Sequence, residues 1–389
     1  MTYRFAYTEH LPTLALVELG AGEAIVGLQR AFEPLAQILQ LPTLRMVGRF
    51  RKRSILLAGQ TLAVLGGLPL VVFGLLAVSG PNGVPLAVTS LLVVAIGLGI
   101  TQTVWFPMLR GYVEPSQVGW FFGLLRTTWH LTLLLFFFGA QRWIATHPGR
   151  FGLLFGAATL AGLLRLAVVA RLPEPPGELG TRVRIREAVR LLGSGTLRRY
   201  LLGVSLGGGI RRTLVPFAIV LMRRVMGLSD AEVLLTTLAY LAGGLASLLL
   251  WGRVVDRYGP GPVFKMTVLG ISICCFSLLG IQGSEGVMPM VGFFFALSVL
   301  TAGFGVADTR VLFSLAPADA PTRVFVVSAV ISSLVSGVLP PLAGISLAAA
   351  LGAGVEPLTA YRALFVAAGL LVALALVPLR VFGTGVPER

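Results

Sequence analysis

The residues best suited to chemistry in this sequence are ionisable side chains inside long apolar segments. Arg211 and Arg212 lie near the middle of one such segment. If the segment spans a bilayer, a charge at that depth costs about 2.5–3.5 kcal/mol on insertion scales, so these side chains should face a cavity or a partner. A guanidinium there is suited to binding an anionic or carbonyl-rich substrate. The alternative is an ion pair with a buried acid, and Asp308 in a later apolar segment is the candidate partner.

Three titratable residues are candidates for carrying a proton, namely Glu33, His130 and Asp308. Histidine titrates near neutral pH, and a carboxyl group inside an apolar segment is a typical member of a proton relay. On a helix, Arg30 lies one turn before Glu33, and Arg126 shares a face with His130. Local pairing without a functional role is therefore the alternative for both sites.

Two further side chains are candidates for the wall of a substrate site. Gln102 and Trp105 lie one turn apart in an apolar segment, and they would supply a polar and an aromatic contact. The alternative for Trp105 is plain packing. Arg165 lies near the end of its own segment, and we expect it to snorkel to the membrane interface.

The sequence contains no recognisable catalytic constellation. The three histidines, His10, His130 and His147, are scattered without the spacing of metal ligands. No Gly-x-x-x-x-Gly-Lys loop is present to hold a nucleotide phosphate. We therefore expect no enzyme activity, no metal, no cofactor and no direct use of ATP.

The composition predicts a membrane protein. Of 389 residues, 56% are hydrophobic and only 12% are charged, whereas a soluble domain carries about 25% charged residues. Helices fit better than an outer-membrane barrel, because the sequence lacks strand-like alternation. The net charge of +15 would suit nucleic-acid binding, but the arginines recur at the ends of apolar runs, which is typical of cytoplasmic loops. We therefore expect no nucleic-acid partner.

The apolar segments indicate two similar halves. Residues 1–172 form the first half, residues 173–198 a basic cytoplasmic linker and residues 199–389 the second half. Predicted membrane helices after the first cover residues 24–47, 55–78, 84–109, 118–143, 151–170, 199–222, 231–251, 263–281, 288–315, 323–351 and 358–382. The first span has only about twenty residues, several of them polar, while a span needs about 20 mostly apolar ones. Either this helix is short, or the chain starts late, and we favour the second interpretation.

A charged turn repeats between the second and third helices of each half. In the second half it runs from Trp251 to Val263. Its motif residues are Gly252, Asp256, Arg257 and Gly259. A weaker copy in the first half aligns Arg45 and Arg49 with two arginines of this turn. Such a repeat is typical of a transporter built by duplication of a membrane unit.

This pattern resembles the Major Facilitator Superfamily over essentially the whole chain. The resemblance implies an all-α membrane protein of 11–12 transmembrane helices in two pseudo-symmetric six-helix bundles, with the first, fourth, seventh and tenth helices around a central cavity. It also implies that Asp256 and Arg257 stabilise a closed state. The first copy departs from the family motif at Leu44, Gly48 and Arg51, which replace glycine, aspartate and glycine. The helix at 118–143 lacks the proline-glycine motif of proton-drug antiporters, which argues against a drug exporter.

The expected function is secondary transport of a small solute by alternating access, with a proton as the candidate coupling ion. The expected location is the bacterial inner membrane, with both termini and the basic loops in the cytoplasm, and the expected state is a monomer. The basic stretch 182–199 is either an amphipathic helix on the inner leaflet or a solvated linker. Two alternatives for the function remain, namely a non-transporting sensor or scaffold of the same fold and a lipid flippase-like protein.

Overall fold

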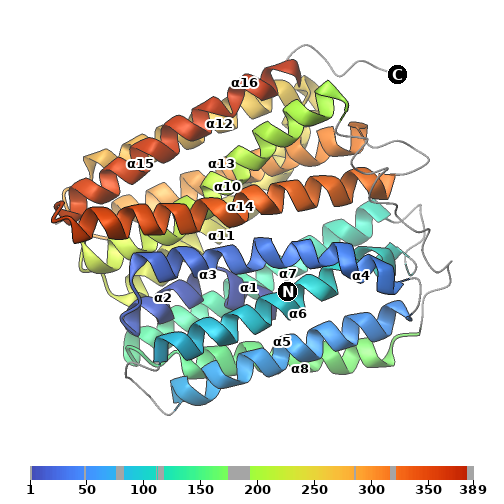
Figure 1. Cartoon of the computed structure of the whole chain (residues 1–389), viewed down its shortest axis with the longest axis horizontal. Coiled ribbons are helices and arrows are strands. Elements are labelled where there is room, and N and C mark those ends of the chain that lie inside the picture. Colours follow the sequence, from blue (N-terminus) through green and yellow to red (C-terminus); the bar gives the residue numbers. More distant parts are fainter. Residues whose placement is uncertain are drawn as a thin grey trace. The chain divides into compact units, whose positions relative to one another are not determined.

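The computed structural model describes residues 2–47, 50–75, 83–110, 112, 118–173, 193–283, 286–315 and 321–382. Every regular element within these ranges is a helix, which confirms the all-α prediction (Figure 1). The chain divides into two compact units, Met1–Arg182 (unit 1) and Val183–Arg389 (unit 2). This division falls inside the predicted linker 173–198, most of which lies outside the described residues.

The predicted first span of unit 1 is divided into two short helices. Its described elements are α1 (Thr2–Thr8), α2 (His10–Glu18), α3 (Glu23–Ala36), η1 (Gln37–Leu39), α4 (Gln40–Val47), α5 (Lys52–Leu75), α6 (Gly83–Arg110), α7 (Val118–Thr146) and α8 (Gly152–Arg171). The predicted helix at 24–47 is present as α3, η1 and α4, joined by right-handed helical backbone at Gln37 and Gln40.

Unit 2 contains longer and less interrupted helices. Its described elements are α10 (Gly195–Arg224), α11 (Asp230–Tyr258), α12 (Pro260–Ser277), η3 (Leu278–Gly280), α13 (Met288–Leu315), α14 (Pro321–Gly352), α15 (Pro357–Leu374), α16 (Leu376–Leu379) and η4 (Arg380–Phe382). Across both units, nine helices of the described residues are long and apolar enough to cross a membrane. Large apolar side chains such as Leu135, Leu249 and Ile273 are 73%, 79% and 66% exposed, as expected when the surrounding solvent is lipid.

Polar caps fix the ends of two unit 2 helices. Ser229 and Glu232 form a capping box at the start of α11. At the start of α15, the Glu356 carboxylate accepts hydrogen bonds from the hydroxyl and N–H groups of Thr359 and from the N–H of Leu358. These hydrogen bonds, led by that from the Thr359 hydroxyl, lower the pKa of Glu356.

The predicted turn from Trp251 to Val263 is wrong in its extent. α11 continues through the charged residues to Tyr258, and only Gly259 leaves the helical conformation, with φ +79°. Gly252 disfavours a helix by only about 1 kcal/mol, and α11 continues through it, so the end of the apolar run does not end the helix. The reversal occurs at Gly259 because glycine adopts positive φ without a steric penalty, and Pro260 then occupies the first position of α12.

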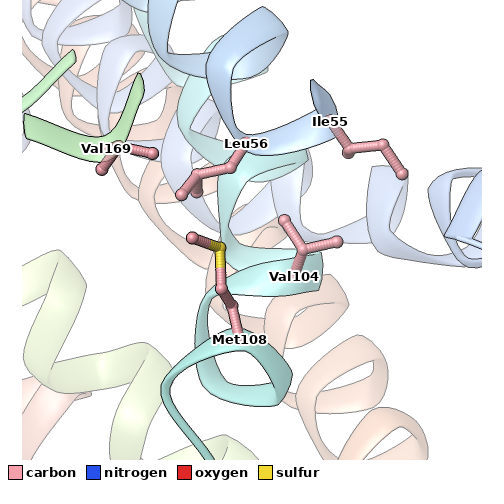
Figure 2. Packing of buried hydrophobic residues seen from close by; sticks show 5 residues of the cluster. All are labelled: Ile55, Leu56, Val104, Met108 and Val169. Atoms are coloured by element: carbon pink, nitrogen blue, oxygen red, sulfur yellow. The ribbon is translucent and has the colours of Figure 1, made fainter. Parts of the chain in front are cut away.

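Unit 1 has a hydrophobic cluster where α5, α6 and α8 meet. Figure 2 shows its five buried members, Ile55, Leu56, Val104, Met108 and Val169. The backbones of α5 and α8 also approach closely at Gly74 and Gly152. A Cβ added at Gly152 would lie 2.2 Å from the carbonyl carbon of Gly74. Close glycine contacts of this kind are typical of helix packing in membranes.

Candidate functional site

The first candidate site lies where the first span of unit 1 is broken. Glu9 separates α1 from α2, with φ −102° and ψ −128°. Pro12 explains the break, because it has no N–H to donate to the carbonyl of Thr8 four residues earlier. Arg30 on α3 supplies the missing donor. Its Nη1 donates to the Thr8 carbonyl at 2.5 Å and to the Glu9 carbonyl at 2.9 Å.

Two ion pairs connect α3 to this broken span. The Arg4 guanidinium donates to Glu33 Oε1 from Nε, at 3.2 Å, and from Nη2. Glu33 is only 8% exposed. One helical turn away, Arg30 Nη2 lies 3.5 Å from Glu9 Oε2. Their spacing along α3 favours a pair between Arg30 and Glu33, but both side chains form ion pairs with residues of the first span.

A group of polar contacts adjoins the hydrophobic cluster of Figure 2, against which Trp105 packs. Arg165 on α8 donates from Nη1 to Gln60 Oε1 on α5 at 2.9 Å. Its guanidinium carbon lies 4.6 Å from the ring centroid of Trp105 on α6, a cation–π contact. The prediction that Arg165 snorkels to the interface is therefore wrong, because polar and aromatic partners within the unit hold it. Arg4 is also near enough for its charge to interact with that of Arg165.

His130 and Gln102 lie elsewhere in unit 1. His130 on α7 is half-buried and stacks on Trp129, with ring centroids 5.2 Å apart. Gln102 on α6 is half-buried. The side chain of Arg126, the proposed neighbour of His130, lies outside the described residues. Glu33 pairs with Arg4, whereas His130 stacks on Trp129, so a joint proton site of Glu33 and His130 stays a prediction.

The second candidate site lies in unit 2, where α10, α13 and α14 meet. Tyr200, which is fully buried, donates its hydroxyl to Asp308 Oδ1 at 2.5 Å. Ser328 on α14 forms a further side-chain hydrogen bond with Tyr200. The charge of Arg211 interacts with the Asp308 carboxylate. The predicted relation between Arg211 and Asp308 is thus electrostatic, and no direct ion pair between them is present among the described residues.

Glycines bring α10 close to its neighbours at this site. A Cβ at Gly207 would lie 2.8 Å from the ring of Phe304 on α13, and one at Gly209 would lie 2.7 Å from Leu339 on α14. α10 nevertheless stays helical from Gly195 to Arg224. The glycines therefore act through close packing. Arg211 and Arg212 follow them on the same helix, and both are half-buried.

The repeated motif lies at one end of unit 2. Asp256 Oδ1 is 3.8 Å from Arg310 Nη1 on α13, and the two side chains are 74% and 63% exposed. Exposed pairs of this kind contribute about 0–1 kcal/mol. The Arg257 guanidinium lies 5.3 Å from the ring centroid of Tyr258. Gly252 lies within α11.

The first copy of the motif is largely outside the described part of the chain. Arg49 and the side chain of Arg45 fall there. In the remainder of the chain, no group of three or more His, Cys, Asp or Glu side chains could hold a metal ion.

Sequence reasoning missed several residues of both sites. Arg4, Glu9 and Tyr200 were not recognised. Arg4 and Tyr200 lie near the ends of apolar segments, where polar residues are ordinary, and Glu9 lies among other polar residues of the first segment. Pro12 could have indicated the break, because a proline inside a helix leaves the carbonyl four residues earlier without its hydrogen-bond donor. The partners themselves are long-range in sequence, as Tyr200 and Asp308 illustrate.

Comparison with known proteins places this fold among transporters. The family model of the Major Facilitator Superfamily matches residues 10–341. No curated protein matches the chain in sequence. Three solved structures are similar over nearly their whole length. The first is an inward-facing, unoccupied bacterial homologue of the human lysosomal transporter Spinster, with a TM-score of 0.71 and 15% identity over 100% of this chain and 96% of that chain. The second is a D-xylose-proton symporter, with a TM-score of 0.70 and 18% identity over 95% of this chain and 93% of that chain. The third is the nucleoside transporter NupG, with a TM-score of 0.69 and 11% identity over 98% of this chain and 96% of that chain. At these identities the structures establish the fold.

Proposed function

Because the chain belongs to the Major Facilitator Superfamily, we propose that it is a secondary transporter that moves a small solute across the membrane by alternating access. The observation that carries this proposal is the family match over residues 10–341. Charged side chains inside apolar helices of both units support it, because such residues in membrane helices typically belong to substrate or proton pathways. The similarity to a D-xylose-proton symporter and to NupG agrees with a transporter of small solutes.

The proposed substrate contact is Arg211, with Arg212, Gln102 and Trp105 as further candidates. Arg211 is half-buried at mid-helix, and the carboxylate that interacts with it, Asp308, already accepts the Tyr200 hydroxyl. The guanidinium is therefore not held by a direct ion pair with that acid, and it can still form charge-assisted hydrogen bonds to a ligand. An anionic or carbonyl-rich solute is the class that this chemistry favours.

The proposed coupling ion is a proton. Glu33 lies on α3 and Asp308 on α13, and each carboxylate is hydrogen-bonded to a side chain from another helix. His130 is the further candidate. The motif residues Asp256 and Arg257 are proposed to stabilise the closed state of the transport cycle. The proposed location is the bacterial inner membrane, with the basic loops and both termini in the cytoplasm.

Transport by an Arg211→Ala variant tests the substrate site. We expect the variant to fold, because Asp308 keeps its hydrogen bond to Tyr200, but to lose at least about tenfold in rate, the effect of one charge-assisted hydrogen bond. The measurement is entrance counterflow in proteoliposomes with a panel of labelled carboxylates, phosphate esters and sugars. Arg199→Ala is the matched control, since Arg199 is exposed on the same helix. Wild-type counterflow by Arg211→Ala would remove this residue from the site.

A non-transporting sensor or scaffold of the same fold is the second candidate function. The degenerate first motif copy favours it, because Leu44, Gly48 and Arg51 replace the family's residues. Counterflow separates the two functions, since a scaffold exchanges no solute. A lipid flippase-like activity would instead show as movement of labelled phospholipid between leaflets in the same proteoliposomes.

A further inference from the structure

Unit 2 contains a groove at the membrane end where α12 begins and the described part of the chain ends. Its volume is about 620 Å³, and it lies between the first turns of α12 and the last turns formed by α16 and η4. Gly261, Phe264 and Lys265 line one wall, and Leu379 and Arg380 line the other. These helices lie side by side in the structure (Figure 1). The groove is remote in sequence from Arg211 and Asp308, and it shares no lining residue with their site.

Both charged residues of this groove are cations. Lys265 and Arg380 are exposed, and among the residues that the structure describes no carboxylate lines the groove. Within the described residues neither of them takes part in an ion pair. The N-terminus of α12 adds the positive end of the helix dipole at the same place. The groove is therefore suited to an anion, and a guanidinium beside an ammonium is a common arrangement for a phosphate.

The rest of the groove is apolar. Phe264 and Leu379 are buried beneath it, at 1% and 3% exposed. Next in sequence to lining residues, Met266, Val377 and Val381 are 57%, 60% and 38% exposed. In a membrane-spanning helix pair, exposed apolar side chains face the acyl chains of the bilayer. A ligand of this groove therefore meets positive charge at one end and hydrocarbon along the rest of its length.

We propose that this groove binds an anionic phospholipid, whose phosphate contacts Lys265 and Arg380 and whose acyl chain lies along the exposed apolar side chains of α12, α16 and η4. Basic pockets between membrane helices near the cytoplasmic surface bind anionic headgroups in this manner. The proposal rests on the chain spanning a membrane, and it is independent of solute transport. A free phosphate has the same headgroup chemistry, but the apolar wall favours the lipid.

The test is lipid retention by the full-length protein. Wild type is purified from mixed micelles with equal amounts of phosphatidylglycerol and phosphatidylcholine, and retained lipids are counted by native mass spectrometry. We expect preferential retention of phosphatidylglycerol. A Lys265→Ala/Arg380→Ala variant should bind it about twenty-five-fold more weakly, since each basic residue near an anionic lipid contributes about fivefold. Lys52→Ala/Arg171→Ala is the matched control, because it removes the same two charge types from the ends of unit 1 helices.

Three outcomes decide the proposal. Selective loss of phosphatidylglycerol in the groove variant, with the control unchanged, supports it. Equal retention by wild type and both variants overturns it. In a second arm, inorganic phosphate is added to protein in phosphatidylcholine discs and the melting temperature is measured. If inorganic phosphate raises the melting temperature as much as phosphatidylglycerol does, the groove is a site for a soluble anion and the lipid proposal is overturned.

Discussion

Replacing Arg30 with alanine is expected to destabilise unit 1 by at least about 3 kcal/mol in an apolar environment. The Thr8 carbonyl would lose its donor, the Glu9 carbonyl would lose one of its hydrogen bonds, and the Glu9 carboxylate would lose its ion pair. Arg30 donates to the carbonyls of Thr8 and Glu9 at the break of the first span. Total stabilities of proteins are about 5–15 kcal/mol, so this loss should sharply reduce the folded yield. The measurement is the fraction of monodisperse protein in detergent and the melting temperature of that fraction.

A second substitution tests whether the loss of stability comes from the missing hydrogen-bond donor at the break or from removing any arginine. Pro12→Ala restores an N–H that can donate to the Thr8 carbonyl along the helix. The Arg30→Ala/Pro12→Ala variant should therefore recover part of the lost stability. Arg171→Ala is the control, since Arg171 is exposed at the end of α8. The explanation is contradicted if Arg30→Ala lowers the melting temperature no more than Arg171→Ala does. It is also contradicted if adding Pro12→Ala to Arg30→Ala recovers no stability, because Arg30 would then not stabilise the break between α1 and α2.

Replacing Arg4 with leucine is the change with the second largest expected effect. Arg4 donates twice to the Glu33 carboxylate, and the side chains of Arg4 and Glu33 are 25% and 10% exposed. Removing one partner of a buried ion pair typically costs about 3–5 kcal/mol, because the remaining charge loses its compensation. We expect a correspondingly lower melting temperature and a lower yield. The measurement is thermal unfolding of the detergent-purified protein.

Neutralising the acid as well should reverse much of this loss. In Arg4→Leu/Glu33→Gln no unbalanced charge is left, so the double variant should be clearly more stable than Arg4→Leu. The double-mutant cycle gives the coupling energy of the two side chains. Additive effects of the two single changes would mean that Arg4 and Glu33 do not stabilise unit 1 as a pair.

The helices themselves could be predicted from the sequence, because apolar runs and turn residues mark them directly. The predicted segment 288–315 coincides with α13, Met288–Leu315. The end of α11 could not be found in this way. Arg253, Asp256 and Arg257 leave the apolar run but do not break a helix, so the helix continues to Tyr258 and ends at Gly259.

The contacts of the charged residues could be predicted only in part. Mid-segment charges such as Arg211 and Glu33 are visible because they are costly in lipid. Their partners are set by how the helices pack, which the local sequence does not contain. Tyr200 and Arg4 lie far from Asp308 and Glu33 in sequence and were therefore missed. Arg165 was misplaced for the same reason, since Gln60 and Trp105 become its neighbours only in the folded unit.

Alternating access itself is tested most directly by distances between the two units in a lipid disc. After Cys274→Ala and Cys275→Ala, spin labels at 150 and 353 report on the predicted outer side, and labels at 52 and 198 report on the basic side. Our account predicts two populated distances for each pair, with the outer distance decreasing when the inner distance increases as pH or solute is changed. A single, unchanging distance for both pairs under every condition would contradict it.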